Sequence, residues 1–305
     1  MVHTNFSLKT KTIIRSDDKN TANNMILDGR PIAQRIESRI AREAFEFQKD
    51  YKMKASLHIV VIGNDEVANL FADITLNKLK NLNMDGQIHK FPEDASDKQV
   101  IDLIKKLSSK KEVHGIIVNL PVPKNLDLRA ILSSIDVEKD VDGQNPYNLG
   151  LLVLGTEDHA PVTPKSVIKI LEEYNVQLTG KRVCIINRTP VVGKPLAMLM
   201  LNRDATVNIC HTKTTDIASL SRSSDIVVVA VGKPLFLKDH MVSENSIVID
   251  VGINKYQGKL VGDADFENLI KKVSMITPVP GGVGSLKTIM IIEQALKNAQ
   301  KLMQR

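Results

Sequence analysis

The sequence predicts an α/β fold built from two three-layer α/β/α domains with mostly parallel sheets. Its 305 residues exceed the roughly 100–200 that one domain usually holds. Short runs of β-branched and other apolar residues alternate with longer stretches in which apolar residues recur every three or four positions. Because strands that alternate with helices usually lie parallel in one sheet, both halves of the chain favour this class.

The composition argues against a membrane protein, a nucleic-acid-binding protein and a zinc protein. The formal net charge is +6, and there are two cysteines and no tryptophan. No apolar run reaches the ~18 residues of a membrane helix, and no basic stripe with interleaved aromatic residues indicates nucleic-acid binding. Cys184 and Cys210 lie in apolar runs and match no zinc pattern, so we expect them to be buried and reduced, with no metal site. The positive charge suits an anionic small molecule, or reflects a lysine-rich surface.

The first 25 residues are polar and lack apolar periodicity, so we expect a disordered extension. Lys9, Lys11 and Arg15 would suit a mitochondrial presequence, but Asp17 and Asp18 count against one. A cytoplasmic location is therefore expected, with the mitochondrion as the alternative.

The first half of the chain shows β-turn-α repeats. Ile32, Ile36 and Ile40 recur every four residues, and Pro31 suits the first turn of a helix. Helices are predicted over residues 31–50, 66–83, 97–109 and 126–134, and strands over residues 56–62, 87–90 and 115–120. A polar, turn-rich segment follows at residues 138–143, and the domain boundary is expected close to it.

The second half repeats this alternation. Strands are predicted over residues 182–186, 206–210, 225–231, 246–251 and 274–276. Helices are predicted over residues 163–174, 193–202, 216–221 and 285–302. The last helix carries Ile289, Ile292 and Ala295 on one side, so we expect it to pack back on the first domain.

The turn at residues 187–193 joins a predicted strand to a predicted helix. Such a turn presents free backbone N–H groups at a helix N-terminus, which suits a pyrophosphate. The segment is not a full GxGxxG motif, since Asn187 holds the first position; asparagine tolerates positive φ better than most residues. Asn187, Arg188, Thr189 and Gly193 are candidate cofactor contacts, with an ordinary βα turn as the alternative.

The end of the next strand bears on the choice of dinucleotide. Folds that select NAD usually carry an acidic residue here to bond the ribose 2′-hydroxyl, but residues 210–214 contain none. Arg188, Thr212 and Lys213 offer donors that suit a 2′-phosphate, so NADP is favoured over NAD. His211 is a further candidate contact, or a satisfied polar residue at a strand end.

Two later loops follow strands of the same predicted sheet. Val231 and Gly232 follow one strand, and Ile253 follows another. Ligands of such sheets bind outside the carboxyl ends of the strands, so these three residues are candidate cofactor contacts. The glycines of both loops could equally be plain turn residues.

Two segments are too specific for composition to explain. Residues 138–143 read EKDVDG, and residues 277–284 read TPVPGGVG. One known family has both segments, and it also has counterparts, in the same order along the chain, of residues 118–121, 163–165, 192–195, 205–207, 210–214 and 261–263. From about residue 26 to the C-terminus, the chain resembles the methylenetetrahydrofolate dehydrogenase/cyclohydrolase (FolD) family.

The resemblance implies NADP- or NAD-linked oxidation of 5,10-methylenetetrahydrofolate to the methenyl form and, in most members, its hydrolysis to 10-formyltetrahydrofolate. It implies a folate-binding catalytic domain (residues 26–145 and 286–305) and a Rossmann-type NAD(P)-binding domain (residues 146–285), in a homodimer paired through the latter. By this resemblance, Asp142 matches the carboxylate that holds the pterin, with an aspartate that caps a turn as the alternative; a carboxylate can accept paired donors from an aminopyrimidine. Leu120, Pro280, Gly281 and Gly282 are further candidate substrate contacts.

The chain departs from the family at the residues of hydrolysis. The family's Tyr-x-x-x-Lys pair and supporting Gln are replaced by Phe71, Thr75 and Asn119. Phe71 can still stack on a ring, whereas Thr75 has no useful base near neutral pH. Lys78 lies one turn beyond Thr75, and Lys287 replaces a usual Thr near the expected folate cleft. Either could partly compensate, with a solvated surface lysine as the alternative for each.

Three hypotheses follow from these departures. The first is an NADP-dependent dehydrogenase with weakened or absent cyclohydrolase activity. The second retains both activities, with Lys78 or Lys287 as the proton shuttle. The third is a non-catalytic folate- or dinucleotide-binding paralogue or dimer partner, which the altered ligand loops favour.

Overall fold

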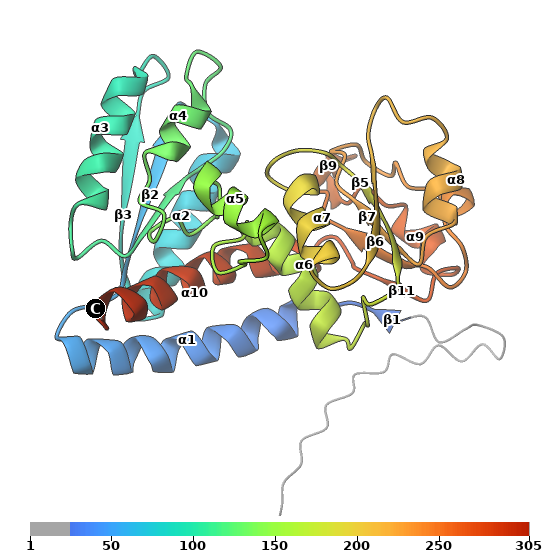
Figure 1. Ribbon diagram of the computed structural model, residues 1–305, viewed down its shortest axis with the longest axis horizontal. Helices are drawn as coiled ribbons and strands as arrows, with labels where there is room; N and C mark the ends of the chain where they lie inside the picture. The colour runs from blue at the N-terminus through green and yellow to red at the C-terminus, as the bar shows by residue number, and fades with distance from the viewer. Residues whose placement is uncertain (1–24, 305) are drawn as a thin grey trace, which may run out of the picture.

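The computed structural model describes residues 25–304. Figure 1 shows two α/β lobes side by side, with the helices α1 (Arg30–Tyr51) and α10 (Gly284–Met303) running along the first lobe toward the second. The extension expected at residues 1–25 lies, apart from Met25, outside the described residues.

The first lobe is built on a three-stranded parallel sheet in the order β3-β2-β4. Its strands are β2 (Ser56–Ile62), β3 (Asp85–Phe91) and β4 (Gly115–Val118). They alternate with α2 (Glu66–Asn81), α3 (Asp97–Ser108) and α4 (Leu128–Ser133). The side chain of Asp65 caps α2, and Ser96 forms a capping box with Gln99 at α3, so both helices begin where the sequence offers a capping residue.

The second lobe contains a six-stranded parallel sheet in the order β1-β11-β8-β7-β5-β6. Its strands are β1 (Met25–Ile26), β5 (Arg182–Ile186), β6 (Thr206–Cys210), β7 (Ile226–Val229), β8 (Ile247–Asp250) and β11 (Met275–Ile276). Its helices are α6 (Val162–Glu173), α7 (Gly193–Leu201), α8 (Ile217–Arg222), α9 (Phe266–Leu269) and a 3₁₀ turn at Asp239–Met241. The predicted α/β class with mostly parallel sheets is confirmed.

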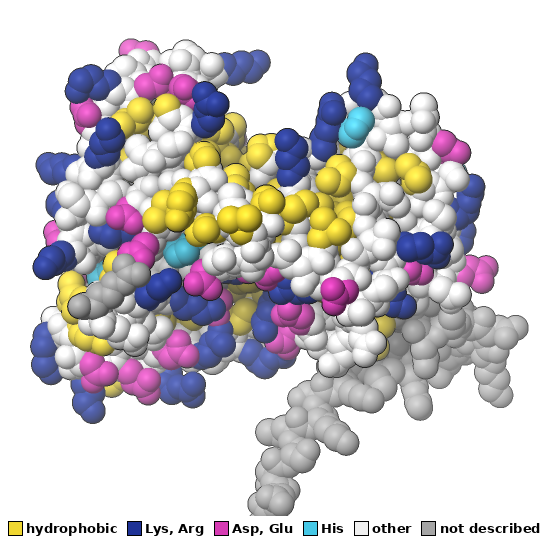
Figure 2. Space-filling model, viewed as in Figure 1, with side chains coloured by type: hydrophobic (Ala, Val, Ile, Leu, Met, Phe, Trp, Pro, Cys, Tyr) yellow, Lys and Arg dark blue, Asp and Glu magenta, His cyan; other side chains and the backbone are white. Residues whose placement is uncertain are grey.

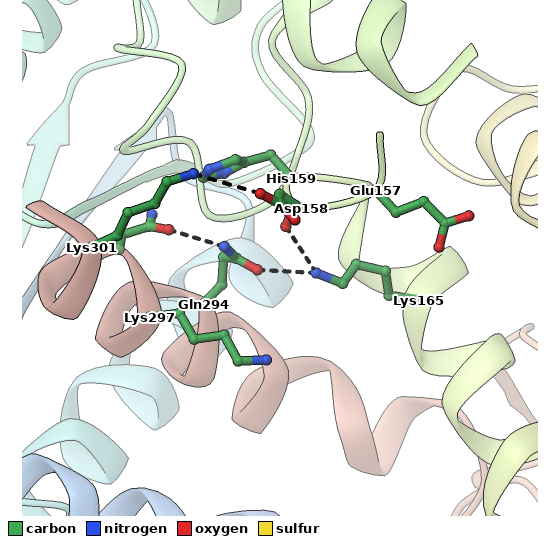
Figure 3. A pocket seen from close by; sticks show the side chains of 8 residues that line it. Glu157, Asp158, His159, Lys165, Gln294, Lys297 and Lys301 are labelled. Carbon is green, nitrogen blue, oxygen red and sulfur yellow. Dashed lines mark hydrogen bonds and ion pairs between the residues drawn. The ribbon is translucent and has the colours of Figure 1, made fainter. Parts of the chain in front are cut away.

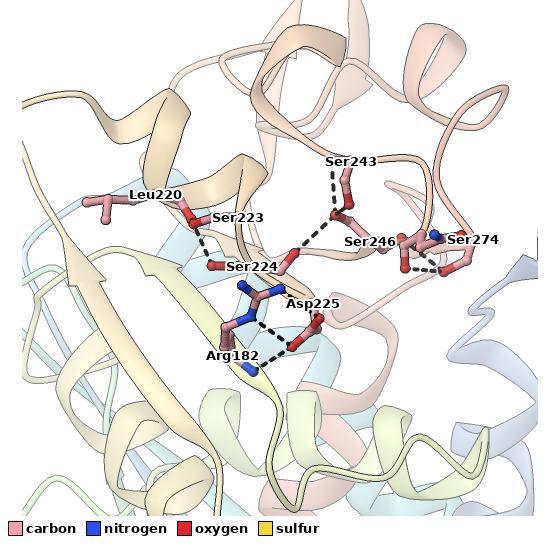
Figure 4. Close-up of polar contacts among 9 residues, drawn as sticks. Arg182, Leu220, Ser223, Ser224, Asp225, Ser243, Ser246 and Ser274 are labelled. Carbon is pink, nitrogen blue, oxygen red and sulfur yellow. Dashed lines mark hydrogen bonds and ion pairs between the residues drawn. The ribbon is translucent and has the colours of Figure 1, made fainter.

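Polar contacts tie together the amino ends of four strands of this sheet (Figure 4). The carboxylate of Asp225 accepts the backbone N–H of Arg182 at 2.8 Å. Ser246 Oγ donates to the carbonyl of Ser224 at 3.2 Å, and Ser274 Oγ donates to that of Ser246 at 3.0 Å. These contacts occupy the edge opposite the predicted ligand loops, which follow the carboxyl ends of the strands.

One hydrophobic core runs through both lobes. Helix α10 contacts α1, β2 and β4 of the first lobe and also α6, which in turn contacts α7 of the second. Leu286, Ile289 and Ile292 of α10 are buried in this core. The C-terminal helix therefore packs back on the first lobe, as predicted.

Six elements among residues 25–304 were not predicted: α9, the 3₁₀ turn at Asp239–Met241, and the helix and three strands described next. Helix α5 (Pro146–Val153) begins at Asn145, whose side chain accepts the N–H of Tyr147 at 2.8 Å. Its apolar residues lie on both the buried and the exposed face, since Leu152 is buried but Val153 is exposed. The sequence of this helix therefore shows no amphipathic period. Figure 2 shows hydrophobic side chains across the middle of the face on which α5 lies. Strand β1 and the antiparallel hairpin of β9 (Asn254–Tyr256) and β10 (Lys259–Val261) are too short to show a period.

Two expectations from composition can be compared with this fold. Cys184 and Cys210 are both buried and are free thiols, as expected, with their Sγ atoms 3.6 Å apart. Within residues 25–304, no helix has the length and apolar character needed to cross a membrane. On the face shown in Figure 2, Lys and Arg side chains are scattered among Asp and Glu.

Candidate functional site

Thr75, at the position of the family lysine, lies on the buried face of α2 with none of its surface exposed. Its hydroxyl donates to the carbonyl of Phe71 at 2.7 Å, one helical turn earlier. Ser and Thr often bond the helix backbone in this way. Because that proton is already used by the helix, Thr75 has no free acid or base to offer a substrate.

A cation from another helix reaches the same place. Nζ of Lys287, near the amino end of α10, lies 4.8 Å from the centroid of the Phe71 ring. Such cation–π contacts are attractive and hold the ammonium over the ring face. Lys78 is engaged elsewhere, since its Nζ pairs with Glu37 of α1 at 2.7 Å. Of the two candidate lysines, Lys287 is therefore the one in contact with a candidate site residue.

Asp142 is the third member of what we call the Phe71–Lys287–Asp142 cluster. Its carboxyl group is buried, and burial raises its pKa to about 6, while the charge of Lys287 acts to lower the pKa. The carboxyl group is therefore held away from water, close enough to the Lys287 ammonium group to interact with its charge. Buried carboxylates with a shifted pKa in such settings are characteristic of functional sites.

The residues beside Asp142 have structural roles. Lys139 Nζ donates to the carbonyls of Ser108 and Lys110, each at 2.6 Å. Asp140 accepts the backbone N–H of Asn145 at 2.8 Å, and burial raises the pKa of its carboxyl group. These bonds fix the EKDVDG segment at the edge of the first sheet and so position Asp142.

Asn119 follows β4 and is only 4% exposed. Its Nδ2 donates to the carbonyl of Ala68 on α2 at 2.9 Å. Its Oδ1 is buried without a partner among residues 25–304. Buried polar atoms are nearly always paired, so Oδ1 is a natural acceptor for a ligand donor. Leu120 follows, half-buried, at a cis bond to Pro121.

The turn after β5 is closed by the side chain of Asn187, not by a positive φ. Asn187 is outside the left-handed region, so the tolerance of positive φ invoked from the sequence was the wrong reason. Its Oδ1 accepts N–H groups from Thr189 at 2.8 Å and Gly193 at 2.9 Å, and its Nδ2 donates to Ala230. The asparagine thus replaces a glycine by bonding the turn to β7. Arg188 is exposed on its outer side.

A buried pair of aspartates, which the sequence did not reveal, organises the next two loops. Asp263 accepts the backbone N–H groups of Val231 at 2.5 Å and Gly232 at 2.9 Å. Asp250 in turn accepts the N–H groups of Asp263 at 3.0 Å and Gly252 at 2.9 Å. The backbone N–H groups of Val231 and Gly232 therefore donate within the protein. A ligand could contact the carbonyl oxygens of these residues and the side chain of Val231. In the sequence, the only indication of this network is the resemblance of residues 261–263 to the FolD family.

The end of β6 forms a tight turn around His211. Nδ1 of His211 accepts the backbone N–H of Lys213 at 3.1 Å, so the neutral ring carries its hydrogen on Nε2. The backbone N–H of His211 donates to Thr214 Oγ1 at 2.9 Å. Thr212 and Lys213 are exposed at the tip. The turn thus presents one hydroxyl and one ammonium group to solvent.

A cavity of about 260 Å³ brings the two sets of candidates together. Ile253, a candidate cofactor contact that is 61% exposed, lines it with Pro280, Gly281 and Gly282, which are candidate substrate contacts. The cavity also includes Ser285, two residues before Lys287. It therefore lies at the amino end of α10, where the two lobes meet.

Comparisons with known proteins agree with this arrangement. The catalytic domain of tetrahydrofolate dehydrogenase/cyclohydrolase matches residues 27–142, and its NAD(P)-binding domain matches residues 161–303. The bifunctional protein FolD of Nitratiruptor sp. is 41% identical over 276 residues, covering 90% of this chain and 98% of the relative.

Solved structures give the same result. The bifunctional FolD enzyme of Campylobacter jejuni is 36% identical with a TM-score of 0.88, covering 91% of this chain and 99% of that one. The Trypanosoma brucei FolD, complexed with NADP cofactor and inhibitor, is 30% identical with a TM-score of 0.88, covering 92% and 99%. The chain belongs to the tetrahydrofolate dehydrogenase/cyclohydrolase family.

Proposed function

We propose that this protein oxidises 5,10-methylenetetrahydrofolate to the methenyl form, with NADP as the hydride acceptor. The observation that carries the proposal is the buried carboxylate of Asp142 in the Phe71–Lys287–Asp142 cluster, together with a cavity that residues of the second lobe line at the amino end of α10. The relatives named above are bifunctional FolD enzymes, and one of them was solved with NADP.

The residues of the first lobe suit a folate. Asp142 can accept two donors from an aminopyrimidine, and Asn119 Oδ1 offers a further unpaired acceptor. The ring of Phe71 can stack on a flat substrate. We assign folate binding to residues 26–145 with 286–305, and NAD(P) binding to residues 146–285. The packing of α10 on β2 and β4 supports this division.

The second lobe suits a phosphorylated dinucleotide. The turn that Asn187 closes leads into α7, whose amino end favours a pyrophosphate. Arg188, Thr212 and Lys213 are exposed on the two adjoining turns and can donate to a 2′-phosphate. The cofactor, when bound, supplies the hydride acceptor, and the protein contributes the placement of the two rings.

The direct test follows NADPH formation spectroscopically on purified protein, with NADP and NAD in parallel. We expect NADPH formation from 5,10-methylenetetrahydrofolate, with a lower kcat/KM for NAD. Arg188→Ala should lower kcat/KM for NADP more than for NAD, because only NADP carries the 2′-phosphate. Calorimetry that detects neither NADP nor folate binding would instead leave only a structural role, such as that of a dimer partner.

A second candidate function is hydrolysis of the methenyl product with Lys287 as the cationic group. The supporting observation is that its ammonium group lies over the Phe71 ring and that its charge acts to lower the pKa of Asp142. The ammonium would enter the cleft from α10 instead of α2, while Thr75 is bonded to the helix backbone. Lys287 could then hold and transfer the proton that Thr75 cannot.

Two lysine variants separate these possibilities. Lys287→Met should lower cyclohydrolase turnover by about 10²-fold, the usual contribution of a proton-transfer group, and dehydrogenase turnover by less. Lys78→Met is the matched control and should leave both unchanged, because Lys78 pairs with Glu37. Unchanged hydrolysis in Lys287→Met would exclude this role. The triple variant Phe71→Tyr, Thr75→Lys, Lys287→Thr restores three of the family residues, with Asn119 unchanged, and should raise hydrolysis in a protein whose native rate is low.

We further propose that the protein is a cytoplasmic homodimer paired through the second lobe. Strand β6 is an edge of the six-stranded sheet, and its Ile209 is 38% exposed, which supports pairing there. The free cysteines are consistent with a reducing compartment. Light scattering should give twice the chain mass, and Ile209→Glu should shift it toward the monomer.

A further inference from the structure

A second cavity of about 350 Å³ lies apart from the Phe71–Lys287–Asp142 cluster and shares no lining residue with it. It is formed by the later turns of α10, the first turn of α6 and the loop at residues 157–159, and Figure 3 shows its side chains. Its lining is polar and includes three lysines. Neither the folate nor the dinucleotide proposal uses it.

Lys165 is one of the residues that line this cavity. Its Nζ donates to Gln294 Oε1 at 3.0 Å and to the backbone carbonyl of Asp158 at 3.2 Å, as Figure 3 shows for the residues drawn. Both acceptors are neutral oxygens, and an ammonium has three hydrogens to donate. Burial lowers the pKa of Lys165 to about 8, and the charge of Lys297 acts in the same direction.

Asn298 supplies a second donor from α10. The residue is 3% exposed and lines the cavity. Its Oδ1 accepts Nε2 of Gln294 at 2.9 Å, which fixes the amide and leaves Nδ2 facing no acceptor within residues 25–304. A buried amide N–H group without a partner is costly, so a ligand acceptor at this point would be stabilised.

The carboxylates around the cavity are already paired with cations. Asp158 lies 3.5 Å from Lys301, and Glu293 accepts Lys297 at 3.2 Å. Glu157 pairs with Arg203 at 2.9 Å, outside the cavity. Lys165 is the cation that donates only to neutral groups. The site therefore offers an incoming anion one ammonium group and one buried amide donor.

We propose that this cavity binds a small tetrahedral oxyanion, of the phosphate or sulfate class, between Lys165 Nζ and Asn298 Nδ2. An oxyanion has enough acceptors for both donors at once, and charge-assisted bonds of this kind are the stronger ones. Lys297 and Lys301 at the rim add to the local positive potential. The ligand is either the free anion or the phosphoryl group of a larger metabolite. The proposal is independent of the catalytic function.

The test is titration calorimetry of the full chain with sodium sulfate at pH 8, at constant ionic strength set by chloride. We expect saturable binding with a Kd of about 1 mM. Sulfate does not titrate at this pH, so measurements in two buffers of different ionisation enthalpy report the proton taken up by the protein. About half a proton should be taken up per sulfate, because Lys165 is half charged in the free protein at its pKa of about 8. Glycerol phosphate and inorganic phosphate in parallel distinguish the two ligand sources.

Five variants test the location of the site. Lys165→Met and Asn298→Asp should each weaken binding by about tenfold or more, whereas Lys165→Arg should keep binding but lose proton uptake. Lys169→Met is the matched control, since Lys169 lies one turn along α6 and pairs with Glu173. Arg188→Ala tests the nucleotide loops. The proposal is overturned if sulfate does not bind, or if folded Lys165→Met and Asn298→Asp bind it as the native chain does, or if Arg188→Ala alone abolishes binding.

Discussion

Two residues show how this chain accommodates departures from its family. Asn187 replaces a glycine and bonds the turn after β5 through its own side chain. Thr75 replaces a lysine and returns its hydroxyl to the helix backbone. In both, a short polar side chain satisfies nearby backbone groups. The first substitution preserves the turn, whereas the second removes the ammonium group, a role that we propose for Lys287 of α10.

The raised pKa of Asp142 predicts a cost in stability. With a pKa of about 6 in the folded chain and about 3.9 unfolded, the folded state holds more protons between these values. The free energy of unfolding therefore falls as pH rises through this window, by roughly 3 kcal/mol in total. Asp142→Asn avoids this cost, so we expect it to unfold at higher denaturant at pH 7.5 while losing folate turnover. The gain should disappear at pH 4, and a stability loss at pH 7.5 would contradict the prediction.

Asp250→Asn should have the opposite effect, although burial raises the pKa of Asp250 to about 7. The two carboxylate oxygens accept backbone N–H groups from Gly252, Asp263 and Ala264. An amide NH₂ in place of either oxygen would face a donor, which costs about 1–3 kcal/mol. Denaturant unfolding at pH 7.5 should show this loss. Equal shifts for Asp142→Asn and Asp250→Asn would show that burial alone, and not hydrogen bonding, governs both sites.

The candidate residues that the sequence could identify are those with a recognisable motif or a conspicuous substitution, such as Asp142 and Lys287. The sequence could not separate Lys287 from Lys78, because α10 and α2 meet only in three dimensions. Nor could it reveal the Asp250–Asp263 network. Its bonds run from carboxylates to backbone N–H groups on distant loops, and such bonds leave no period or spacing in the sequence.

At the scale of elements, periodicity predicted the long helices and the buried strands within a few residues. Strand β2 and strand β5 have the predicted bounds, since each is a buried apolar run that ends in turn residues. Helix α5 escaped prediction because exposed Tyr147 and Val153 interrupt its pattern. Short elements such as β1 depend on pairing with a distant strand, β11, and carry no local signal.

The turn between β5 and α7 requires glycine at its end. A Cβ on Gly193 would lie 2.1 Å from the carbonyl oxygen of Asn187, a backbone atom that cannot move without opening the turn. Gly193→Ala should weaken NADP binding by about tenfold or more, which is at least ~1.4 kcal/mol. Gly150→Ala in α5 is the control, because no atom lies within 4 Å of the added Cβ. Calorimetry should show native NADP affinity for Gly150→Ala alone.

At the scale of the whole molecule, α10 joins the two lobes, to which we have assigned different ligands. Its amino end lies beside the cavity at Ile253, its middle packs on β2 and β4, and its later turns contribute Asn298 to the second cavity. The sequence predicted that this helix returns to the first lobe. It could not show that α6 and α10 continue the core into the second, because amphipathic periodicity defines a buried face but not its partners.

A continuous core through α10 predicts that the lobes unfold together. Ile292 is fully buried on α10, and Ile292→Ala should lower the free energy of unfolding by about 2–5 kcal/mol. Ile74→Ala is the matched control on α2, where the side chain is 47% exposed and the loss should be much smaller. Since the chain has no tryptophan, circular dichroism can be paired with the fluorescence of bound NADPH. The two signals should be lost in one transition that shifts to lower denaturant in Ile292→Ala. If circular dichroism fell while NADPH stayed bound, the first lobe would unfold alone, and α10 would not couple the two lobes.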